Sequence, residues 1–121
     1  MKRPWTVLSA LLLFVAFGAW AAPEIPDGVR ALAQDRCAGC HKGKFPPKGL
    51  NLEPANLAAI IDAPSRQIPE AKIVDPKAPQ TSYLLRKVRG ESGIAGRPMP
   101  PGKALTAEEI QLLASWIEGL K

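Results

Sequence analysis

The sequence predicts an all-α domain with about four short helices and long loops, and three observations support this fold class. Apolar side chains recur at three- and four-residue spacing in four short segments, as they do along one face of a helix. No segment alternates apolar and polar residues as a half-buried strand would. Proline and glycine, at 13 and 10 of 121 residues, indicate a chain with many turns.

The first two helices are predicted on either side of a loop rich in lysine, glycine and proline at residues 42–52. Asp27 can cap a helix that runs to about Arg36. Its apolar face consists of Val29, Leu32 and Ala33. Pro54 suits the first turn of the second helix, which ends at about residue 62. The apolar stripe of this helix consists of Leu57, Ile60 and Ile61.

The third helix follows residues 64–79, a segment with four prolines that we expect to be irregular but ordered. It starts near Ser82 and stops at Gly90, because glycine favours the left-handed conformation found just beyond a helix C-terminus. Its buried side chains are expected to be Leu84, Leu85 and Val88.

The last helix has the clearest start and follows a second loop rich in glycine and proline, residues 91–103. Thr106 and Glu109 have the spacing of a capping box, in which each side chain bonds the backbone of the other residue. Apolar residues then follow at helical spacing: Ile110, Leu113, Trp116, Ile117 and Leu120.

The first 21 residues have the three regions of a secretory signal peptide. Lys2 and Arg3 form a basic start, residues 7–17 are almost wholly apolar, and Ala19-Trp20-Ala21 ends the segment. We expect cleavage after Ala21 and export to the periplasm. The alternative is an uncleaved anchor, although the apolar run is shorter than the ~20 residues that a membrane span needs. The predicted organisation is a signal peptide at 1–21, an N-terminal arm at 22–26 and a domain at 27–121.

Composition excludes several classes of function. Removal of the signal peptide leaves 100 residues, with 14 lysines and arginines, 11 acidic residues and one histidine. Two cysteines and one histidine cannot supply a structural zinc site without carboxylates, nor a scaffold of several disulfides, and one histidine argues against a hydrolytic triad. The remaining aromatic residues are Phe45, Tyr83 and Trp116. So small a set of large side chains needs something else to fill the centre of the domain.

The run Cys37-Ala38-Gly39-Cys40-His41 has the Cys-x-x-Cys-His pattern of a covalent haem attachment site. Two thiols separated by two residues can each add to one haem vinyl group, and His41 is then held on one side of the ring, where its imidazole reaches the iron. Ala38 and Gly39 are too small to crowd the edge of the ring. Export agrees with this interpretation, because such attachment takes place outside the cytoplasm. We therefore predict one covalently bound haem c.

The same five residues have three alternative interpretations. A thioredoxin-like redox pair would require a strand–helix–strand context and neighbours that lower a thiol pKa. A disulfide across two residues would be strained. A zinc ion would require two further cysteine or histidine ligands, which the chain lacks.

Met99 is the one methionine that remains after the signal peptide. A single methionine is most often core filler. This one lies among Pro98, Pro100 and Pro101 instead of on a helical stripe, and prolines lower the entropy that a loop loses when it fixes a thioether against a metal. Met99 is therefore predicted to be the second axial ligand beside His41, with an open or water-bound iron as the alternative.

Taken together, these features resemble a monohaem cytochrome c. The resemblance depends on the signal peptide, the attachment run, Met99-Pro100-Pro101 and an amphipathic last helix that ends in Trp116-Ile117-Glu118-Gly119. It covers about residues 29–120 and is closest to the bacterial group with a Met-Pro-Pro ligand loop, sometimes called planctomycete-type. It implies short helices and long loops wrapped round one covalent haem, with the first and last helices crossing beside it.

The resemblance also assigns roles to individual residues. It implies thioether links at Cys37 and Cys40, the proximal iron ligand at His41 and the distal ligand at Met99. The better-known mitochondrial-like members have a glycine and an aromatic residue on the first helix where it crosses the last, whereas the corresponding face here offers Val29 and Ala33. Those members also use a proline carbonyl to accept the imidazole N–H of the proximal histidine, for which the candidates here are Pro46 and Pro47.

The predicted ligand set favours electron transfer over catalysis. An iron with both axial positions filled by the protein has no easy site for a substrate or oxygen, and a thioether ligand raises the reduction potential relative to two histidines. We therefore predict a one-electron carrier between periplasmic redox partners, and not an enzyme. The alternatives are an electron-transfer subunit of a larger oxidoreductase complex and, less favoured, a haem-based sensor or peroxidase in which Met99 leaves the iron.

Both loops that contain predicted ligands are locally basic. The only charged residues between Asp35 and Glu53 are Arg36, Lys42, Lys44 and Lys48, and those between Glu91 and Glu108 are Arg97 and Lys103. This charge predicts redox proteins or complexes with an acidic docking face as partners. The alternative is that the cations offset the two haem propionates or are simply solvated. The modest net charge of the exported chain argues against nucleic-acid binding, and no stable membrane span is expected.

Overall fold

The computed structural model describes residues 2, 15, 16, 18 and 22–120, so the predicted signal peptide and its cleavage site lie almost wholly outside the described residues. Its helices in chain order are α1 (Asp27–Arg36), the 3-10 helices η1 (Pro47–Gly49), η2 (Pro54–Ile60) and η3 (Pro79–Thr81), α2 (Tyr83–Arg89) and α3 (Ala107–Glu118). The described part of the chain has no β-strand, only two isolated bridges, which confirms the all-α class. None of the helices in that part is long and apolar enough to cross a bilayer.

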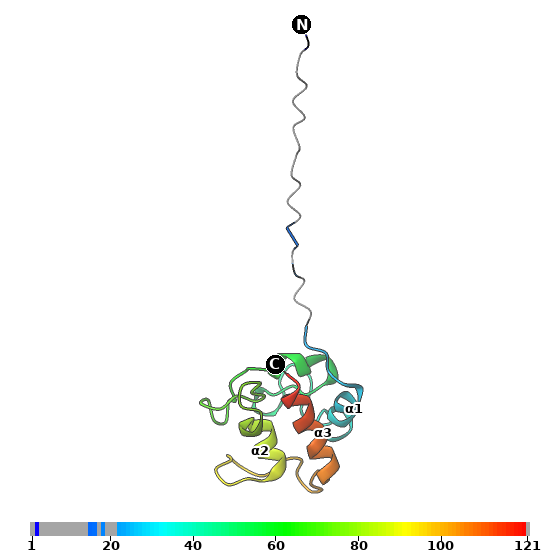
Figure 1. The fold of residues 1–121 in the computed structure, drawn as a ribbon. Coiled ribbons are helices and arrows are strands. Elements are labelled where there is room, and N and C mark those ends of the chain that lie inside the picture. Colours follow the sequence, from blue (N-terminus) through cyan, green and yellow to red (C-terminus); the bar gives the residue numbers. More distant parts are fainter. Residues whose placement is uncertain (1, 3–14, 17, 19–21, 121) are drawn as a thin grey trace.

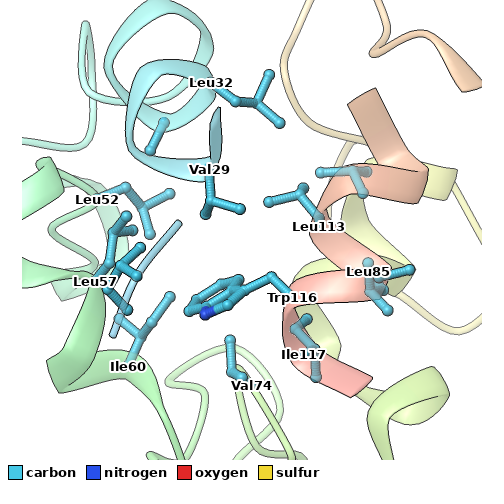
Figure 2. Packing of buried hydrophobic residues seen from close by; sticks show 14 of the residues in the cluster. Val29, Leu32, Leu52, Leu57, Ile60, Val74, Leu85, Leu113, Trp116 and Ile117 are labelled. Atoms are coloured by element: carbon cyan, nitrogen blue, oxygen red, sulfur yellow. The ribbon is translucent and has the colours of Figure 1, made fainter. Parts of the chain in front are cut away.

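Helix α3 packs against both α1 and α2 (Figure 1). The predicted apolar faces meet in the core, where Val29 and Ile117 have no exposed surface and Trp116 is 5% exposed. Figure 2 shows the Trp116 indole directed away from α3 toward the side chains of the facing segments. The first and last helices therefore pack together, as the sequence resemblance implies.

The contact between α1 and α3 includes a glycine that the sequence analysis did not consider. Gly28 lies in the first turn of α1, and a Cβ atom added there would stand 3.4 Å from the Leu112 side chain. That distance is an ordinary van der Waals contact, so the contact accommodates glycine without strictly requiring it. Val29 and Ala33 face Trp116 nearby, across a void of about 20 Å³.

Most helix ends lie at or close to the residues that the sequence predicts. Gly90 ends α2 with φ of +64°, and Ser82 precedes its first residue. The capping box of α3 is present, with the Glu109 N–H donating to Thr106 Oγ1 at 3.2 Å and the Thr106 N–H donating to Glu109 Oε2 at 2.8 Å. The exception is Asp27, which is the first residue inside α1 and not its cap. Its carboxylate there still favours the helix N-terminus through the helix dipole.

The predicted second helix is a 3-10 helix, η2, seven residues long. Leu57 and Ile60 are buried as predicted, whereas Ile61 lies beyond the helix and is half-buried. Ile61 instead starts a short pairing with the proline-rich segment: the Asp62 N–H donates to the Val74 carbonyl, and the Ile73 N–H to the Ala63 carbonyl, both at 2.8 Å.

The proline-rich segment also completes the start of α2. The Tyr83 and Leu84 N–H groups have no partner inside the helix, and they donate to the Lys72 and Ile73 carbonyls at 2.9 and 3.0 Å. Residues 64–79 are therefore irregular but ordered, as predicted, because main-chain hydrogen bonds fix them on both sides.

Candidate functional site

A cavity of about 720 Å³ lies between the turn after α1, the segments around η1 and η2, helix α2 and the loop that contains Met99. Its lining includes all four residues that the sequence analysis selected: Cys37, Cys40, His41 and Met99. The volume is within the ~300–1,000 Å³ of small-molecule and cofactor sites. The fold thus brings the predicted site residues together around one space.

The attachment run is positioned by the C-terminus of α1. The Cys37 N–H donates to the Ala33 carbonyl at 3.0 Å, so Cys37 closes the last turn of the helix. The His41 N–H donates to the Cys37 carbonyl at 3.0 Å, which folds the five residues into a compact turn. Both thiols are free, with Cys37 half-buried and Cys40 exposed.

His41 is held through its backbone and through its ring. The Leu52 N–H donates to the His41 carbonyl at 2.8 Å, and His41 Nδ1 lies 3.0 Å from the Leu50 carbonyl oxygen. A carbonyl oxygen can only accept a hydrogen bond, so Nδ1 carries the proton. The lone pair of Nε2 is then left for a ligand, in the arrangement usual for metal-binding histidines.

The imidazole partner is therefore Leu50, and neither of the two predicted prolines. The reason is the turn made by η1, in which both proline carbonyls are already occupied. The Pro46 carbonyl accepts from the Gly49 N–H at 2.9 Å, and the Pro47 carbonyl from the Leu50 N–H at 3.1 Å. The first carbonyl beyond that turn is free to face the ring.

Met99 is tied to helix α2 at its own backbone. Its N–H donates to the Lys87 carbonyl at 3.0 Å, and its side chain is half-buried. The glycine that ends α2 lets the loop approach, because a Cβ atom on Gly90 would stand only 3.2 Å from Pro98 Cγ. The prolines around Met99 thus belong to a loop that packs on the helix next to the cavity.

Comparison with known protein families matches residues 27–121 to the family described as cytochrome c. The chain belongs to the cytochrome c family. Comparisons with curated proteins and with solved structures found no match. As a cytochrome c domain, the chain has the Cys37 and Cys40 pair suited to covalent haem c and takes part in haem-based electron transfer. Members of the family are typically electron carriers rather than enzymes.

The residues around the cavity of this cytochrome c fit a haem group. Two free thiols, which could each form a thioether link with a haem vinyl group, lie at one part of the lining together with an imidazole that suits iron. Much of the wall is apolar, as a flat macrocycle requires: Leu50, Leu52, Ile60, Ile73, Leu84 and Val88. Another part of the lining is polar and largely basic, which suits a cofactor with carboxylate groups: Lys48, Arg66, Gln67, Tyr83 and Lys87.

The alternative interpretations of the cysteine pair do not fit this cytochrome c. Burial raises the pKa of the Cys37 thiol above its ordinary value, although the Arg36 guanidinium opposes the shift. A thioredoxin-like pair requires the opposite direction. Within the described residues, no cluster of three or more histidine, cysteine, aspartate or glutamate side chains could hold a metal ion, so a zinc site is not supported there.

The polar part of the cavity was not predicted from the sequence. Tyr83 and Lys87 are four residues apart on α2, and helical spacing alone could have placed them on one face. Arg66 and Gln67 come from the proline-rich segment, and no local pattern indicates that they reach the same space. The sequence does not indicate that the Leu50 carbonyl is the partner of His41 either, because a residue of any type can supply a backbone acceptor.

Proposed function

We propose that this protein is an exported monohaem cytochrome c that carries one electron at a time between periplasmic redox partners. The observation that supports the proposal most strongly is that His41 and Met99 line the same largely apolar cavity as the two thiols. In this proposal His41 and Met99 are the axial ligands, and two protein ligands favour outer-sphere electron transfer over catalysis. When bound, the haem iron supplies reversible one-electron chemistry.

Each proposed ligand is oriented by a group that does not itself touch the iron. The Leu50 carbonyl fixes the His41 ring and keeps its proton on Nδ1. The Lys87 carbonyl holds the Met99 backbone on the end of α2. Ligands held in this way need little rearrangement between the two oxidation states, which is the requirement of an electron carrier.

Two finer assignments belong to the same proposal. The chain is proposed to belong to the bacterial group with a Met-Pro-Pro ligand loop, and the support is that Met99, Pro100 and Pro101 all line the cavity. Export to the periplasm is supported by the signal-peptide pattern of residues 1–21, and by the chemistry of haem attachment outside the cytoplasm.

The proposed partners are redox proteins with an acidic docking face. Lys42, Lys44 and Lys48 are exposed on the loop that follows His41. Phe45 lies among them with 95% of its surface exposed. An exposed aromatic side chain with lysines on both sides of it in the sequence suits a partner that has an apolar patch next to carboxylates.

The proposal is tested by a redox titration of the purified holoprotein with absorbance spectra recorded at each potential. We expect a single reversible one-electron transition and spectra of an iron with histidine and thioether ligands in both states. Rapid binding of carbon monoxide to the reduced wild-type protein at neutral pH would contradict the proposal and favour a sensor or peroxidase.

Substitution of Met99 tests the second ligand directly. We expect Met99→Ala to retain covalent haem, because Cys37 and Cys40 are unchanged, but to bind carbon monoxide rapidly in the reduced state. The potential should fall, because a thioether ligand favours ferrous iron. Carbon monoxide binding and the absorbance spectrum are the measurements, and an unchanged spectrum would rule out Met99 as a ligand.

A further inference from the structure

Lys87 is a buried cation whose charge the proposed ligand set does not explain. Lys87 lies on α2 with 7% of its surface exposed, and it lines the cavity. Burial, and secondarily the nearby Lys48 ammonium, lower the pKa of Lys87. The ion pairs formed in residues 22–120 all involve other cations, so no carboxylate of that part of the chain neutralises Lys87. A buried charge without a counter-charge is costly and requires an explanation.

The hydrogen bonds around Lys87 leave donors without acceptors. Its Nζ donates to the Ala95 carbonyl at 2.7 Å, which uses one of three N–H bonds. Tyr83 Oη accepts from the Ala95 N–H at 3.0 Å and donates to Gln67 Oε1 at 3.1 Å. Because the Gln67 oxygen faces Tyr83, the amide nitrogen of Gln67 is turned the other way.

The side-chain nitrogens of Lys87 and Gln67 lie near each other, and both residues line the cavity. A Cβ atom added to Gly96 would stand 3.8 Å from Gln67 Nε2 and 3.9 Å from Lys87 Nζ, so both nitrogens approach this glycine. Lys48 and Arg66 line the same cavity and add further positive charge. A wall with several donors, no carboxylate beside Lys87 and a net positive charge is complementary to an anion.

We propose that Lys87, assisted by Gln67, binds a propionate carboxylate of the haem, and that this ion pair raises the reduction potential of the iron. The inference rests on the proposed function, because it requires a haem in the cavity. It identifies a counter-charge for the buried ammonium and an acceptor for the free Gln67 amide. It also gives Lys87 two roles, since its backbone carbonyl holds Met99 while its side chain holds the propionate.

The ion pair affects the potential through its charge. A cation close to the haem opposes the extra positive charge of ferric iron, so its removal stabilises the ferric state and lowers the potential. Lys87→Met keeps most of the length of the side chain and removes its charge, together with the donor that bonds the Ala95 carbonyl. The backbone bond from Met99 to residue 87 is unchanged in this variant, so the thioether ligand should stay in place.

The experiment is an equilibrium redox titration of the holoprotein at neutral pH, in low and in high salt. The variants are Lys87→Met and Lys87→Arg, with Lys48→Met as the matched control, because Lys48 lines the same cavity from an exposed position. We expect Lys87→Met to lower the potential by at least twice the shift of the control, and Lys87→Arg to restore most of it. In about 1 M salt the control shift should vanish, whereas the Lys87→Met shift should persist because a buried pair is poorly screened.

Equal shifts for Lys87→Met and Lys48→Met, or a Lys87→Met shift that disappears in high salt, would overturn the inference. The absence of covalent haem or of a reversible transition in the wild-type protein would instead overturn the proposed function, so the two failures are distinguishable. If Lys87→Met yields no folded holoprotein, the reduction potential of Gln67→Met is the deciding measurement. We expect this neutral substitution to lower the potential because it removes the amide donor, and an unchanged potential would refute propionate binding at this place.

Discussion

Arg36 connects three parts of the site through one guanidinium group. Its Nη1 donates to both carboxylate oxygens of Glu109 at 3.0 and 2.9 Å, and its Nη2 donates to the Lys103 carbonyl at 2.7 Å. Arg36 directly precedes Cys37, and Lys103 follows the Met99 loop. The attachment run, the exit of the ligand loop and the start of α3 are therefore held together by one side chain.

This arrangement predicts that arginine is required at position 36. We expect Arg36→Lys to lower the free energy of unfolding of the holoprotein nearly as much as Arg36→Ala, because one ammonium cannot replace the planar set of donors. Arg89→Ala is the control, since Arg89 Nη1 lies 3.7 Å from Glu91 in a looser pair, and its effect should be smaller by roughly twofold or more. Denaturant unfolding measures all three, and full stability of Arg36→Lys would contradict the prediction.

The Glu109 carboxylate stabilises the N-terminus of helix α3, because it accepts hydrogen bonds from the Thr106 N–H and from Arg36. The hydrogen bond from the Thr106 N–H, and to a smaller extent the Arg36 guanidinium, hold the pKa of the Glu109 carboxyl below its ordinary value. The same helix contributes Trp116 and Ile117 to the core. The position of the core side chains therefore depends on a carboxylate at the other end of the element.

The lowered pKa of Glu109 predicts a pH-dependent contribution to stability. A carboxyl with a lower pKa in the folded state stabilises the fold above its unfolded pKa, and this contribution is lost as the pH falls through the folded pKa. We expect Glu109→Gln to be less stable than wild type at about pH 6, with the difference shrinking as the pH falls below about 4. Denaturant unfolding across this range measures it, with Glu91→Gln as the control, and a difference that grows on acidification would contradict the assignment.

On the scale of the whole molecule, the interior has two apolar parts that share a wall. Leu52, Ile60 and Val88 belong to the core around Trp116 and also line the cavity. Within residues 22–120, the buried side chains clustered with Trp116 are all aliphatic. A haem in the cavity would therefore complete the interior of a small domain in which few large side chains remain.

The charge of the molecule predicts how it meets other redox agents. We expect the triple variant Lys42→Gln, Lys44→Gln, Lys48→Gln to be oxidised by ferricyanide roughly threefold or more slowly than wild type at low ionic strength. Oxidation by the cationic tris(phenanthroline)cobalt(III) should become faster, and both differences should shrink in high salt. Stopped-flow absorbance measures the rates, with Lys77→Gln as the control. An equal change for both oxidants would show that the loop lysines do not steer.

Local patterns predicted most of the helices, because caps and apolar spacing act within one element. Thr106, Glu109 and Gly90 are examples in which the residue and its structural role are adjacent in the sequence. The attachment run could be recognised for the same reason. Gln67 and the Leu50 carbonyl could not be predicted, because their roles arise only when segments far apart in the chain, or a turn within a loop, bring a backbone or amide group to the site.

The loop that follows His41 is closed at its base, and this gives the chain a modular segment. The Leu52 N–H donates to the His41 carbonyl at 2.8 Å, and Asn51 Nδ2 donates to the Gly43 carbonyl at 3.2 Å. These two bonds join the first and last residues of the loop before its exposed part begins. Lengthening such a loop costs little, about 0.6 kcal/mol for each doubling. Insertions or exchanges at residues 44 and 45, before the turn made by η1, could therefore redirect the protein to a new partner while the histidine keeps its place, so that recognition can evolve separately from ligation.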